Sequence, residues 1–522
     1  MTTLIQRFET NAARNPDKAA LIYSHNGDWI TVTYAQLLDS TLRFSTGLSA
    51  CALTPGMSAA LMTPPSADFF ALAFALLKNG IVPILVDPAI GLKKVGECLR
   101  ESKPDIFIGN SLTHSLRIIF GWGKESIQQN LTIELVKRSS FKIQPVIAGC
   151  SSDMAAIIYT SGSTGLPKGA VYTQANFAAQ LDMLANTFNI SPDEIDLPAF
   201  PLYALIDVLL GVTSVIPDIS FPVPAKTDPE KVLNAIRKFH VSHMFASPVL
   251  LNILANSQQE TGALQSLKRV VTAGAPATIP LQIKFRKLLD EKTDLFGIYG
   301  ATETLPIAKV ESREIFTMKE KTEQGSGVCL GMPVEQVNVR IIKITDDPIA
   351  EWQDSLTVES NVVGEITVQS PATTRSYIHR EEANRLSKIK CGEDVIHRMG
   401  DVGYFDDAGR LWYCGRKSQR VITTDAVMFT EQIEGIFNAH PLIYRTALVG
   451  VNKEPVLWVE LEKGVRENKD KIKNELIDLA SQHPQASRIK DFLFMKKFPA
   501  DVRHNSKIIR EQLTLFAKKR LT

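Results

Sequence analysis

Helical segments and apolar, strand-like segments alternate along much of this chain, and this alternation is the feature that most constrains its fold. Residues 67–77 have the composition of a buried helix, and the apolar run at 81–86 ends at an Asp-Pro pair. An amphipathic helix is predicted over Leu92–Ser102 and a short strand over residues 106–108. The same order returns later, with helices predicted at 229–239 and 248–255 and strands at 241–245 and 270–274. Such alternation predicts parallel sheet covered by helices.

The pattern changes near residue 337. Residues 337–344 and Gly364–Gln369 alternate like strands of a smaller sheet, and turn-forming residues are frequent over 400–416. Beyond this point the chain mixes α and β character, with helices predicted at 431–438 and 471–481. We therefore predict a large N-terminal domain over residues 1–417 and a small C-terminal domain over residues 418–522.

Composition is typical of a globular protein of two to four core-forming units, with 522 residues of which 44% are hydrophobic and 22% charged. A net charge of +2 gives no electrostatic reason to expect nucleic acid as a partner. The six cysteines have neither CxxC nor zinc-ligand spacing, which favours reduced thiols. The stretch 197–216 is long enough for a membrane span, but Asp207 and two prolines interrupt it. The N-terminus lacks a signal-peptide pattern, so we expect a cytoplasmic protein without a transmembrane segment.

A loop rich in glycine and hydroxyl groups directly follows one predicted buried strand. The apolar run Met154–Tyr159 leads into the sequence TSGSTGLPKG. Glycines let backbone N–H groups converge on one point, and hydroxyls and a lysine complete a cradle for phosphate oxygens. The loop lacks the GKS or GKT ending of the Walker pattern. A solvent-exposed linker is the alternative interpretation. The candidate phosphate ligands are Thr160, Ser161, Gly162, Ser163, Thr164, Gly165 and Lys168.

Two further segments carry residues suited to a nucleotide base and a metal ion. In Tyr299-Gly300-Ala301-Thr302-Glu303 the aromatic ring could stack on a purine, and the Thr-Glu pair could offer oxygen ligands to Mg²⁺. The segment Gly274-Ala275-Pro276 is a tight turn after a predicted strand, where a flat base could lie against the backbone.

Another two segments could hold a ribose and a phosphate. Asp401, in the sequence GDVGY, could accept hydrogen bonds from two ribose hydroxyls, and Arg416, in the sequence GRK, could supply a cation. Each signal is weak alone. An aspartate between glycines is usually part of a turn, and a lone arginine is usually a surface residue.

Taken in order, YTSGSTGLPKG, YGATE, GDVGY and GRK resemble the acyl-adenylate-forming superfamily, and the resemblance covers nearly the whole chain. It implies an α/β fold with stacked mixed or parallel sheets, a β subdomain and a small mobile α+β C-terminal domain. It also implies that ATP and Mg²⁺ are used, with Thr302 and Glu303 catalytic and Glu303 on the metal. A carboxylate would attack the α-phosphate of ATP to give an acyl-adenylate and pyrophosphate.

The same resemblance implies a catalytic lysine near the C-terminus, on a loop that swings into the site. We assign this role to Lys507, in the sequence DVRHNSK. Relatives carry Thr-x-x-Gly-Lys there, and Arg503 and Ser506 replace the threonine and the glycine. The alternative is that Lys507 is one cation among many in a basic tail.

Four passages are similar to the bacterial olefin β-lactone synthetases: LVDP at 85–88, FPLYAL at 200–205, GRKSQRV at 415–421 and DVRHNSK at 501–507. This similarity implies that a 2-alkyl-3-hydroxy fatty acid is activated as its acyl-AMP. The 3-hydroxyl then attacks the acyl carbon and expels AMP, closing a β-lactone for olefin biosynthesis. Residues 200–205 would line the acyl pocket through Phe200, Leu202 and Tyr203, or would be buried core beside it. Partner enzymes of a hydrocarbon pathway are implied in the same way.

A medium- or long-chain acyl-CoA ligase is the alternative within the same chemistry. Ser418 stands where many such ligases have a hinge Asp or Lys, and Asp425 stands where they usually have a glycine beside the pantetheine path. A carboxylate at that position would repel a thiol donor rich in phosphate, or it could simply suit a turn. A catalytically silent scaffold is the alternative from another class. The presence of Glu303, Asp401 and Lys507 argues against it.

Overall fold

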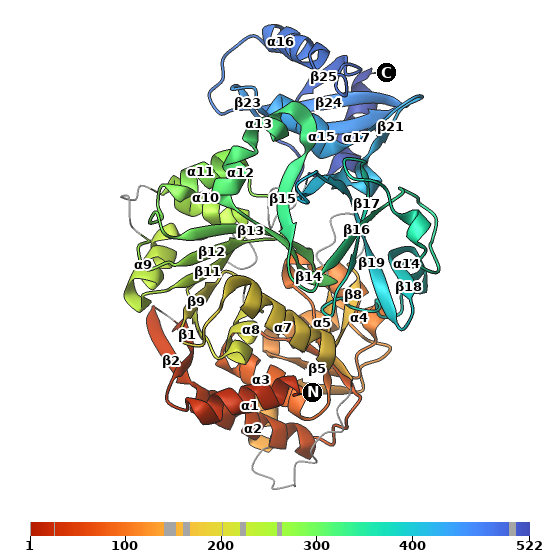
Figure 1. The fold of residues 1–522 in the computed structure, drawn as a ribbon. Coiled ribbons are helices and arrows are strands. Elements are labelled where there is room, and N and C mark those ends of the chain that lie inside the picture. The colour runs from red at the N-terminus through yellow and green to blue at the C-terminus, as the bar shows by residue number, and fades with distance from the viewer. Residues whose placement is uncertain are drawn as a thin grey trace.

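The computed structural model describes residues 2–25, 27–139, 153–159, 167–200, 202–219, 226–257, 264–500 and 508–521 (Figure 1). The largest sheet has 14 strands, in the order β16-β17-β19-β20-β15-β14-β13-β12-β11-β9-β10-β1-β2 with β18 paired to β19. Its strands are β1 (Ala19–His25), β2 (Asp28–Thr33), β9 (Ile195–Pro198), β10 (Thr213–Ile216), β11 (His243–Ala246), β12 (Arg269–Thr272), β13 (Asp294–Ala301), β14 (Thr304–Glu311), β15 (Val328–Pro333), β16 (Asn338–Ile342), β17 (Gly364–Gln369), β18 (Lys388–Cys391), β19 (Asp394–Phe405) and β20 (Leu411–Arg416).

This sheet has two halves with different strand directions. From β1 through β10, β9, β11 and β12 to β13, every neighbouring pair is parallel. From β13 through β14, β15 and β20 to β19, β17 and β16, every pair is antiparallel. Parallel strands are buried on both faces and need covering helices, whereas antiparallel strands can be joined by short turns. The two halves therefore correspond to the predicted α/β region and the predicted smaller β region.

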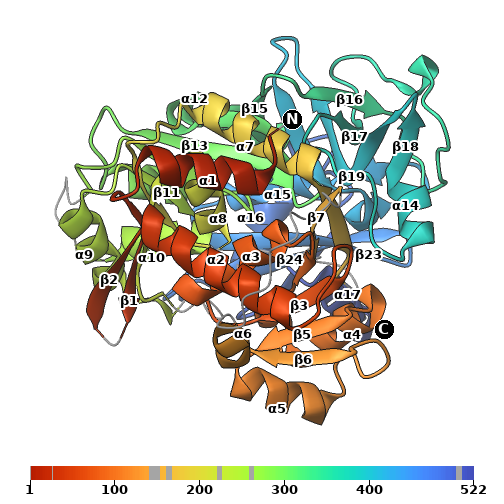
Figure 2. The same cartoon turned by 90° about the horizontal axis from the view of Figure 1, so that it is seen from below.

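A second sheet of six strands, in the order β6-β5-β3-β4-β7-β8, lies below the first in Figure 1. Helices from the N-terminal region fill the space between the two sheets, as the view from below shows (Figure 2). The rings of Phe8 and Phe74 stack in this core with centroids 4.4 Å apart. The strands are β3 (Ser58–Met62), β4 (Val82–Leu85), β5 (Ile106–Gly109), β6 (Gln129–Thr132), β7 (Met154–Tyr159) and β8 (Gly169–Thr173).

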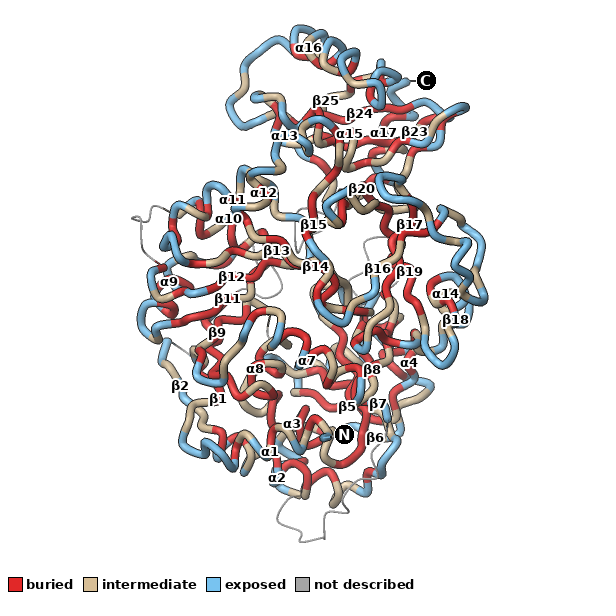
Figure 3. Tube along the Cα trace, viewed as in Figure 1, coloured by how far each residue is buried: buried red, intermediate tan, exposed pale blue. Residues whose placement is uncertain are grey.

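Helices cover both sheets, and buried residues concentrate on the strands and on the helix faces that meet them (Figure 3). The helices of this part of the chain are α1 (Leu4–Arg14), α2 (Tyr34–Ala50), α3 (Ala67–Lys78), α4 (Leu92–Ser102), α5 (Ser111–Phe120), α6 (Ile133–Ser139), α7 (Gln174–Phe188), α8 (Tyr203–Leu210), α9 (Pro229–Phe239), α10 (Pro248–Asn256), α11 (Ile279–Arg286), α12 (Ser312–Thr317), α13 (Lys319–Lys321) and α14 (Glu381–Ser387). Across the described ranges, no helix combines the length and the apolar character that a bilayer crossing requires. The cysteines in those ranges are free.

The C-terminal residues build a separate small layer at the top of Figure 1. Its sheet is β23-β24-β25, with one apolar core around Phe437 and Phe492 and another around Trp458 and Phe498. It meets the rest of the molecule where α15 packs on the turn Thr322–Ser326 and on β20. The elements are β21 (Val421–Ile422), β22 (Val427–Met428), α15 (Thr430–Asn438), β23 (Ile443–Val451), β24 (Glu454–Leu461), α16 (Lys469–Ser481), β25 (Asp491–Phe494) and α17 (Arg510–Leu521).

The structure confirms the predicted fold class and most predicted elements, including α4 and α9 at the predicted bounds. The predicted strand at 241–245 is wrong at its start, because β11 begins at His243. Helix α9 ends at His240 in the left-handed conformation, and the Val241 N–H donates to the Ile236 carbonyl at 3.1 Å. Val241 therefore closes the helix end, as in a Schellman motif, and cannot also begin the strand.

Candidate active site

The parallel half of the large sheet brings two predicted nucleotide segments to one edge. Strands β12 and β13 are parallel neighbours, with Thr272 level with Gly297. The segment at 274–276 follows β12 and the segment at 299–303 spans the end of β13. Both therefore lie at the carboxyl ends of adjacent strands, where open α/β sheets bind ligands. Gly274 has φ +89°, a backbone conformation that favours glycine. Gly274 and Pro276 are exposed and Ala275 is half-buried.

A tight hairpin between β13 and β14 presents Thr302 and Glu303, because Ala301 pairs with Thr304 across it. A side chain at Gly300 would place Cβ 2.4 Å from Leu305 Cδ1, so only glycine fits under the turn without a shift. The Tyr172 hydroxyl donates to the Thr302 carbonyl, which ties the hairpin to β8.

Glu303 is held by a tyrosine that the sequence reasoning missed. The Tyr377 hydroxyl donates to Glu303 Oε1 at 2.5 Å. Tyr377 reaches this place because residues around it pair with β8, with the Ile378 N–H donating to the Gly169 carbonyl at 2.8 Å. Lys168 Nζ lies 5.0 Å from the Tyr377 ring centroid, a cation–π contact. The tyrosine thus stands between the last cation of the predicted phosphate loop and the predicted metal carboxylate.

A second half-buried lysine, Lys388, faces the same ring. Its Nζ donates to the Thr374 carbonyl at 2.5 Å and lies 5.5 Å from the Tyr377 centroid. Burial is the main cause that lowers the pKa of Lys388 to about 7; Glu303 opposes the fall and Lys168 contributes to it. Burial also lowers the pKa of Lys168. A polyphosphate between these groups would restore their positive charge, since opposite charge favours the ionised form.

Asp401 joins the two halves of the large sheet. Its Cα pairs with that of Arg416 across β19 and β20, and Arg416 NH1 lies 2.9 Å from Asp401 Oδ1. The Tyr299 hydroxyl, on β13, donates to Asp401 Oδ2 at 2.6 Å. Burial raises the pKa of Asp401, while Arg416 and Tyr299 oppose that rise. The structure therefore brings the YGATE, GDVGY and GRK segments together.

One oxygen of this carboxylate fits a ligand hydroxyl. The Arg416 contact lacks hydrogen-bond geometry, so Asp401 Oδ1 accepts no hydrogen bond from the described residues, although Asp401 is only 3% exposed. Buried acceptors in folded proteins nearly always have a partner. A ribose hydroxyl would supply one.

The two basic residues after Gly415 point to different partners. While Arg416 faces Asp401, Lys417 Nζ lies 3.1 Å from Glu365 Oε1. Glu365 is also paired with Arg398 at 2.6 Å, and both of these side chains are 1% exposed. Lys417 therefore belongs to a buried network that anchors the strand end, and Arg416 is the cation left for a ligand.

Some predicted site residues lie outside the described residues. The strand ends around the phosphate loop are described, and Tyr159 pairs with Gly169 across β7 and β8. The bridge between Ala500 and Ile508 likewise flanks residues 501–507. The residues outside the description are Thr160, Ser161, Gly162, Ser163, Thr164, Gly165 and Lys507.

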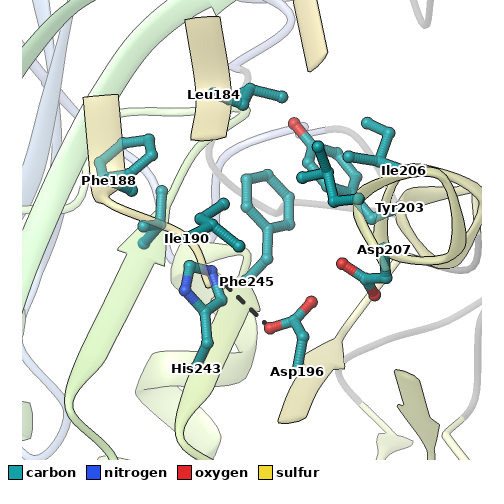
Figure 4. A pocket seen from close by; sticks show the side chains of 11 residues that line it. Leu184, Phe188, Ile190, Asp196, Tyr203, Ile206, Asp207, His243 and Phe245 are labelled. Atoms are coloured by element: carbon teal, nitrogen blue, oxygen red, sulfur yellow. Dashed lines mark ion pairs between the residues drawn. The ribbon is translucent and has the colours of Figure 1, made fainter. Parts of the chain in front are cut away.

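On the acyl side, a small cavity of about 30 Å³ lies between the parallel strands and helices α7 and α8. Tyr203 lines it and stacks on Phe245, with centroids 3.7 Å apart. Phe200 and Leu202 are not among its lining residues, so this cavity takes only one of the three predicted pocket residues. The lining consists of Leu184, Phe188, Ile190, Asp196, Tyr203, Ile206, Asp207, Leu210, His243, Phe245 and Val271 (Figure 4).

The sequence and structure of this chain match known adenylate-forming proteins. A family model described as AMP-binding enzyme matches residues 8–378. The chain belongs to the AMP-binding enzyme family. The family expected from the four motifs is thereby confirmed.

Two relatives of this AMP-binding enzyme are about 40% identical to it over most of the chain. The olefin β-lactone synthetase of Xanthomonas campestris pv. campestris is 41% identical over 509 residues, covering 94% of this chain and 91% of that protein. The enzyme of the same name from Stenotrophomonas maltophilia is 40% identical over 512 residues, covering 94% and 92%. The fold is similar to that of O-succinylbenzoate coenzyme A synthetase from Bacillus subtilis in complex with ATP and magnesium ion, with a TM-score of 0.77, 24% identity and coverage of 97% and 98%.

The residue set of this AMP-binding enzyme fits a magnesium ion that is held mainly by phosphate. Within the described ranges, no group of three or more His, Cys, Asp or Glu residues could hold a metal by itself. Mg²⁺ is usually bound by one or two carboxylates together with substrate phosphates and water. Glu303, with the Thr302 hydroxyl beside it, matches that donor set. When bound, the ion would neutralise charge on the phosphate oxygens.

The structure changes the argument about coenzyme A that Asp425 suggested. Asp425 lies on the turn between β21 and β22 and accepts hydrogen bonds from Arg488 NH1 and NH2, each at 2.5 Å. The Thr423 and Thr424 hydroxyls also contact Asp425 Oδ1. These contacts favour the turn interpretation and oppose much of the carboxylate's repulsion of a phosphate-rich thiol. Ser418 lies in the short helical turn Lys417–Gln419.

Proposed function

We propose that this AMP-binding enzyme is an olefin β-lactone synthetase acting on a 2-alkyl-3-hydroxy fatty acid. The observation that carries the proposal is the 41% identity to an enzyme of that name, which extends over 94% of this chain. In the first step, a carboxylate oxygen of the acid attacks the α-phosphorus of ATP, and pyrophosphate leaves. In the second step, the 3-hydroxyl oxygen attacks the acyl carbon, loses its proton to a base, and AMP leaves with the bonding electron pair. An internal nucleophile gains from proximity, so no second substrate is required.

We assign the site residues separate roles in the first step. Asp401 accepts the ribose hydroxyls, and Tyr299, fixed by its bond to Asp401, presents its ring to the base beside residues 274–276. Lys168 and residues 160–165 bind the terminal phosphates, with Glu303 on their magnesium ion. Lys507 places its charge at the α-phosphate and the acyl oxygen. Preorganised charges of this kind lower a barrier at which negative charge develops on oxygen.

Movement of the small C-terminal layer relative to the ATP site bears on the second step. We place the domain boundary at residues 417 and 418, directly after the Arg416 and Lys417 anchors. Rotation about this boundary would move residues 501–507 relative to the ATP site. We further propose that the enzyme works in the cytoplasm, beside enzymes that make the hydroxy acid and consume the lactone.

One assay separates the proposal from an acyl-CoA ligase. The protein is incubated with ATP, Mg²⁺ and a 2-alkyl-3-hydroxy acid, with and without coenzyme A, and AMP, pyrophosphate and organic products are measured. We expect AMP and the β-lactone in equal amounts without coenzyme A. A product that forms only with coenzyme A, and is a thioester, would establish the ligase instead.

The assigned lysine can be tested on the same reaction. Lys507→Ala should lower the rate of pyrophosphate release by about 10²–10³-fold, because it removes a charge aimed at the reacting oxygens. ATP affinity, measured by calorimetry, should change little. Lys519→Ala, in the exposed last turn of α17, is the matched control and should behave as the native protein. Normal turnover in Lys507→Ala would remove the residue from the mechanism.

A further inference from the structure

A row of buried polar side chains crosses the parallel strands beneath the acyl-side cavity. Ser214 on β10 is level with Asp196 on β9, Asp196 is level with His243 on β11, and His243 is level with Arg269 on β12. Each of these residues is at most 8% exposed. In Figure 4, Asp196 lies between His243 and Asp207, with the apolar walls above them.

The hydrogen bonds of this row leave two neighbouring polar atoms that a single oxygen atom beside them would satisfy. Arg269 Nε donates to His243 Nδ1 at 2.9 Å, so a neutral His243 carries its proton on Nε2. That nitrogen lies 3.7 Å from Asp196 Oδ1, which is too far for a hydrogen bond. Asp196 Oδ1 is buried and has no hydrogen-bond partner among the described residues. A water or hydroxyl to one side of this pair, within hydrogen-bond distance of both atoms, would accept from Nε2 and donate to Oδ1.

The charges around the row favour a neutral partner over an ion. Arg269 is already paired with Glu194 at 2.5 Å, and Asp207 Oδ2 accepts from the Ser214 hydroxyl at 2.7 Å. Burial raises the pKa of both Asp196 and Asp207, which lie next to each other, and Arg269 opposes the rise at Asp196. Burial and Arg269 lower the pKa of His243. A neutral molecule that both donates and accepts suits this set better than a cation or an anion.

The distance between this row and Tyr299 determines which part of a substrate could reach the row. His243 is level with Arg269, and Arg269 with Asp294 on β13, so Tyr299 lies five residues further along the sheet. At about 3.3 Å per residue, the separation along the strands is about 16 Å. An acid whose carboxylate reacts near Tyr299 therefore cannot bring its 3-hydroxyl to this row. Only the far end of an alkyl chain could arrive there.

We propose that Asp196, Asp207 and His243 form a polar floor that limits the length of the alkyl chain through a bound water. The proposal rests on the proposed function, because it assumes an alkyl-chain substrate. The walls above the floor are apolar, including Phe188, Ile206 and Val271, and the cavity of about 30 Å³ has room for about two waters. Each methylene buried against the walls strengthens binding by about fourfold. A methyl group that displaces the floor's water leaves Asp196 Oδ1 and His243 Nε2 without a hydrogen-bond partner among the described residues and weakens binding by about tenfold or more.

The native protein provides the first test. kcat/KM for pyrophosphate release is measured over a homologous series of 2-alkyl-3-hydroxy acids. We expect a rise with chain length and then an abrupt fall of about tenfold or more where the methyl group reaches the floor. At that length, an acid with a terminal hydroxyl should recover most of the loss, because the hydroxyl replaces the water. A gradual profile, or a terminal hydroxyl that recovers nothing, overturns the polar floor.

A pair of variants provides the second test. Asp196→Leu has a similar shape but no polar atoms, and it should abolish both the abrupt fall and the preference for the terminal hydroxyl. Asp196→Asn keeps a polar floor and should retain both, with melting temperatures used to confirm folding. Equal behaviour of the two variants overturns the proposal, and if Asp196→Leu does not fold, the native profile decides.

Measuring pyrophosphate release distinguishes failure of the polar-floor proposal from failure of the proposed function. Pyrophosphate release reports adenylation, whatever becomes of the adenylate. A smooth chain-length profile with normal adenylation removes only the floor, whereas adenylation of none of these acids overturns both proposals.

Discussion

Two buried carboxylate clusters lie on the same sheet, and they differ in what surrounds them. Asp401, on the ATP side, has a guanidinium 2.9 Å away and a phenol donating at 2.6 Å. Asp207, on the acyl side, has a serine hydroxyl at 2.7 Å and a second carboxyl, Asp196, as its neighbour. Burial raises the pKa of both, but only Asp401 has a cation in contact. The first cluster is arranged to accept hydrogen bonds as an anion, and the second to hold protons.

The position of each cluster in the fold explains this difference. The Asp401 cluster forms where the Tyr299 side chain on β13 meets β19 and β20, and the Arg416 side chain in it is 41% exposed. The Asp196 and Asp207 cluster lies among parallel strands covered by α7 and α8, where the lining above it is apolar. In low-dielectric surroundings a carboxyl without a cation is protonated more readily than it is ionised. Variants on each side test whether the clusters do these different tasks.

The largest effect is expected at Glu303, on the ATP side. Glu303→Gln removes the charge assigned to the magnesium ion and should slow pyrophosphate release by about 10²–10³-fold. Tyr377→Phe is the matched control, since it removes only the 2.5 Å hydrogen bond to Glu303, and it should cost less than about tenfold. Both rates are measured at saturating ATP over a range of Mg²⁺ concentrations. Equal losses would mean that Glu303 acts through Tyr377 rather than through the metal.

The next effect concerns Asp401 Oδ1, which accepts no hydrogen bond from the described residues. Asp401→Asn should weaken ATP binding by about 10–100-fold, because hydrogen bonds to a charged group are lost. The native protein should also prefer ATP to 2′-deoxyATP, and the variant should lose most of that preference. Calorimetry with both nucleotides measures the two effects. An unchanged preference in Asp401→Asn would show that the ribose is held elsewhere.

The structure brings together Tyr299, Asp401 and Arg416, predicted for the nucleotide, whereas only one of three predicted acyl-pocket residues lines the cavity, for a physical reason. Tyr299, Glu303, Asp401 and Arg416 lie in short glycine-containing segments, where the backbone turn and the side chain are specified together. Tyr377 lies in no such segment, and only its pairing with β8, far away in the chain, shows that it contacts Glu303. Local patterns do not carry that information.

The acyl side depends on register between strands, which a single sequence does not show. In the sequence, Asp207 stands out only as a charge that interrupts an apolar stretch, and no local pattern marks His243. His243 lies beside Asp196 because β11 pairs with β9. Asp207, on α8, accepts from Ser214 on β10, which is level with Asp196. The sequence signal available for this cluster is a carboxylate inside an apolar segment, because carboxylates are seldom buried without a partner.

A smaller effect is expected in the pH dependence of stability on the acyl side. The pKa of Asp207 is raised to about 7 by burial, from about 3.9 in an unfolded chain. Between these values the unfolded chain releases a proton that the folded chain keeps, so the free energy of unfolding falls as pH rises from about 4 to about 7. Asp207→Asn cannot titrate and should have a flatter melting temperature across this window, by a few degrees. Melting curves at pH 5 and pH 8 measure this difference, and parallel profiles for the two proteins would contradict it.

The smallest effect is a proton taken up on the ATP side. Burial lowers the pKa of Lys388 to about 7, so at pH 8 much of this lysine is neutral in the free protein. Bound phosphate would raise that pKa, because negative charge favours the ammonium form, and ATP binding should then take up part of a proton. Calorimetry at pH 8 in two buffers of different ionisation enthalpy measures the uptake.

Lys388→Met should abolish this proton uptake, while Lys390→Met, at an exposed position on the same strand, should not. Asp196 and Asp207 should add nothing to this signal, because the adenylation site lies about 16 Å along the strands from the Asp196 row. Equal uptake in Lys388→Met and native protein would place the proton on another group.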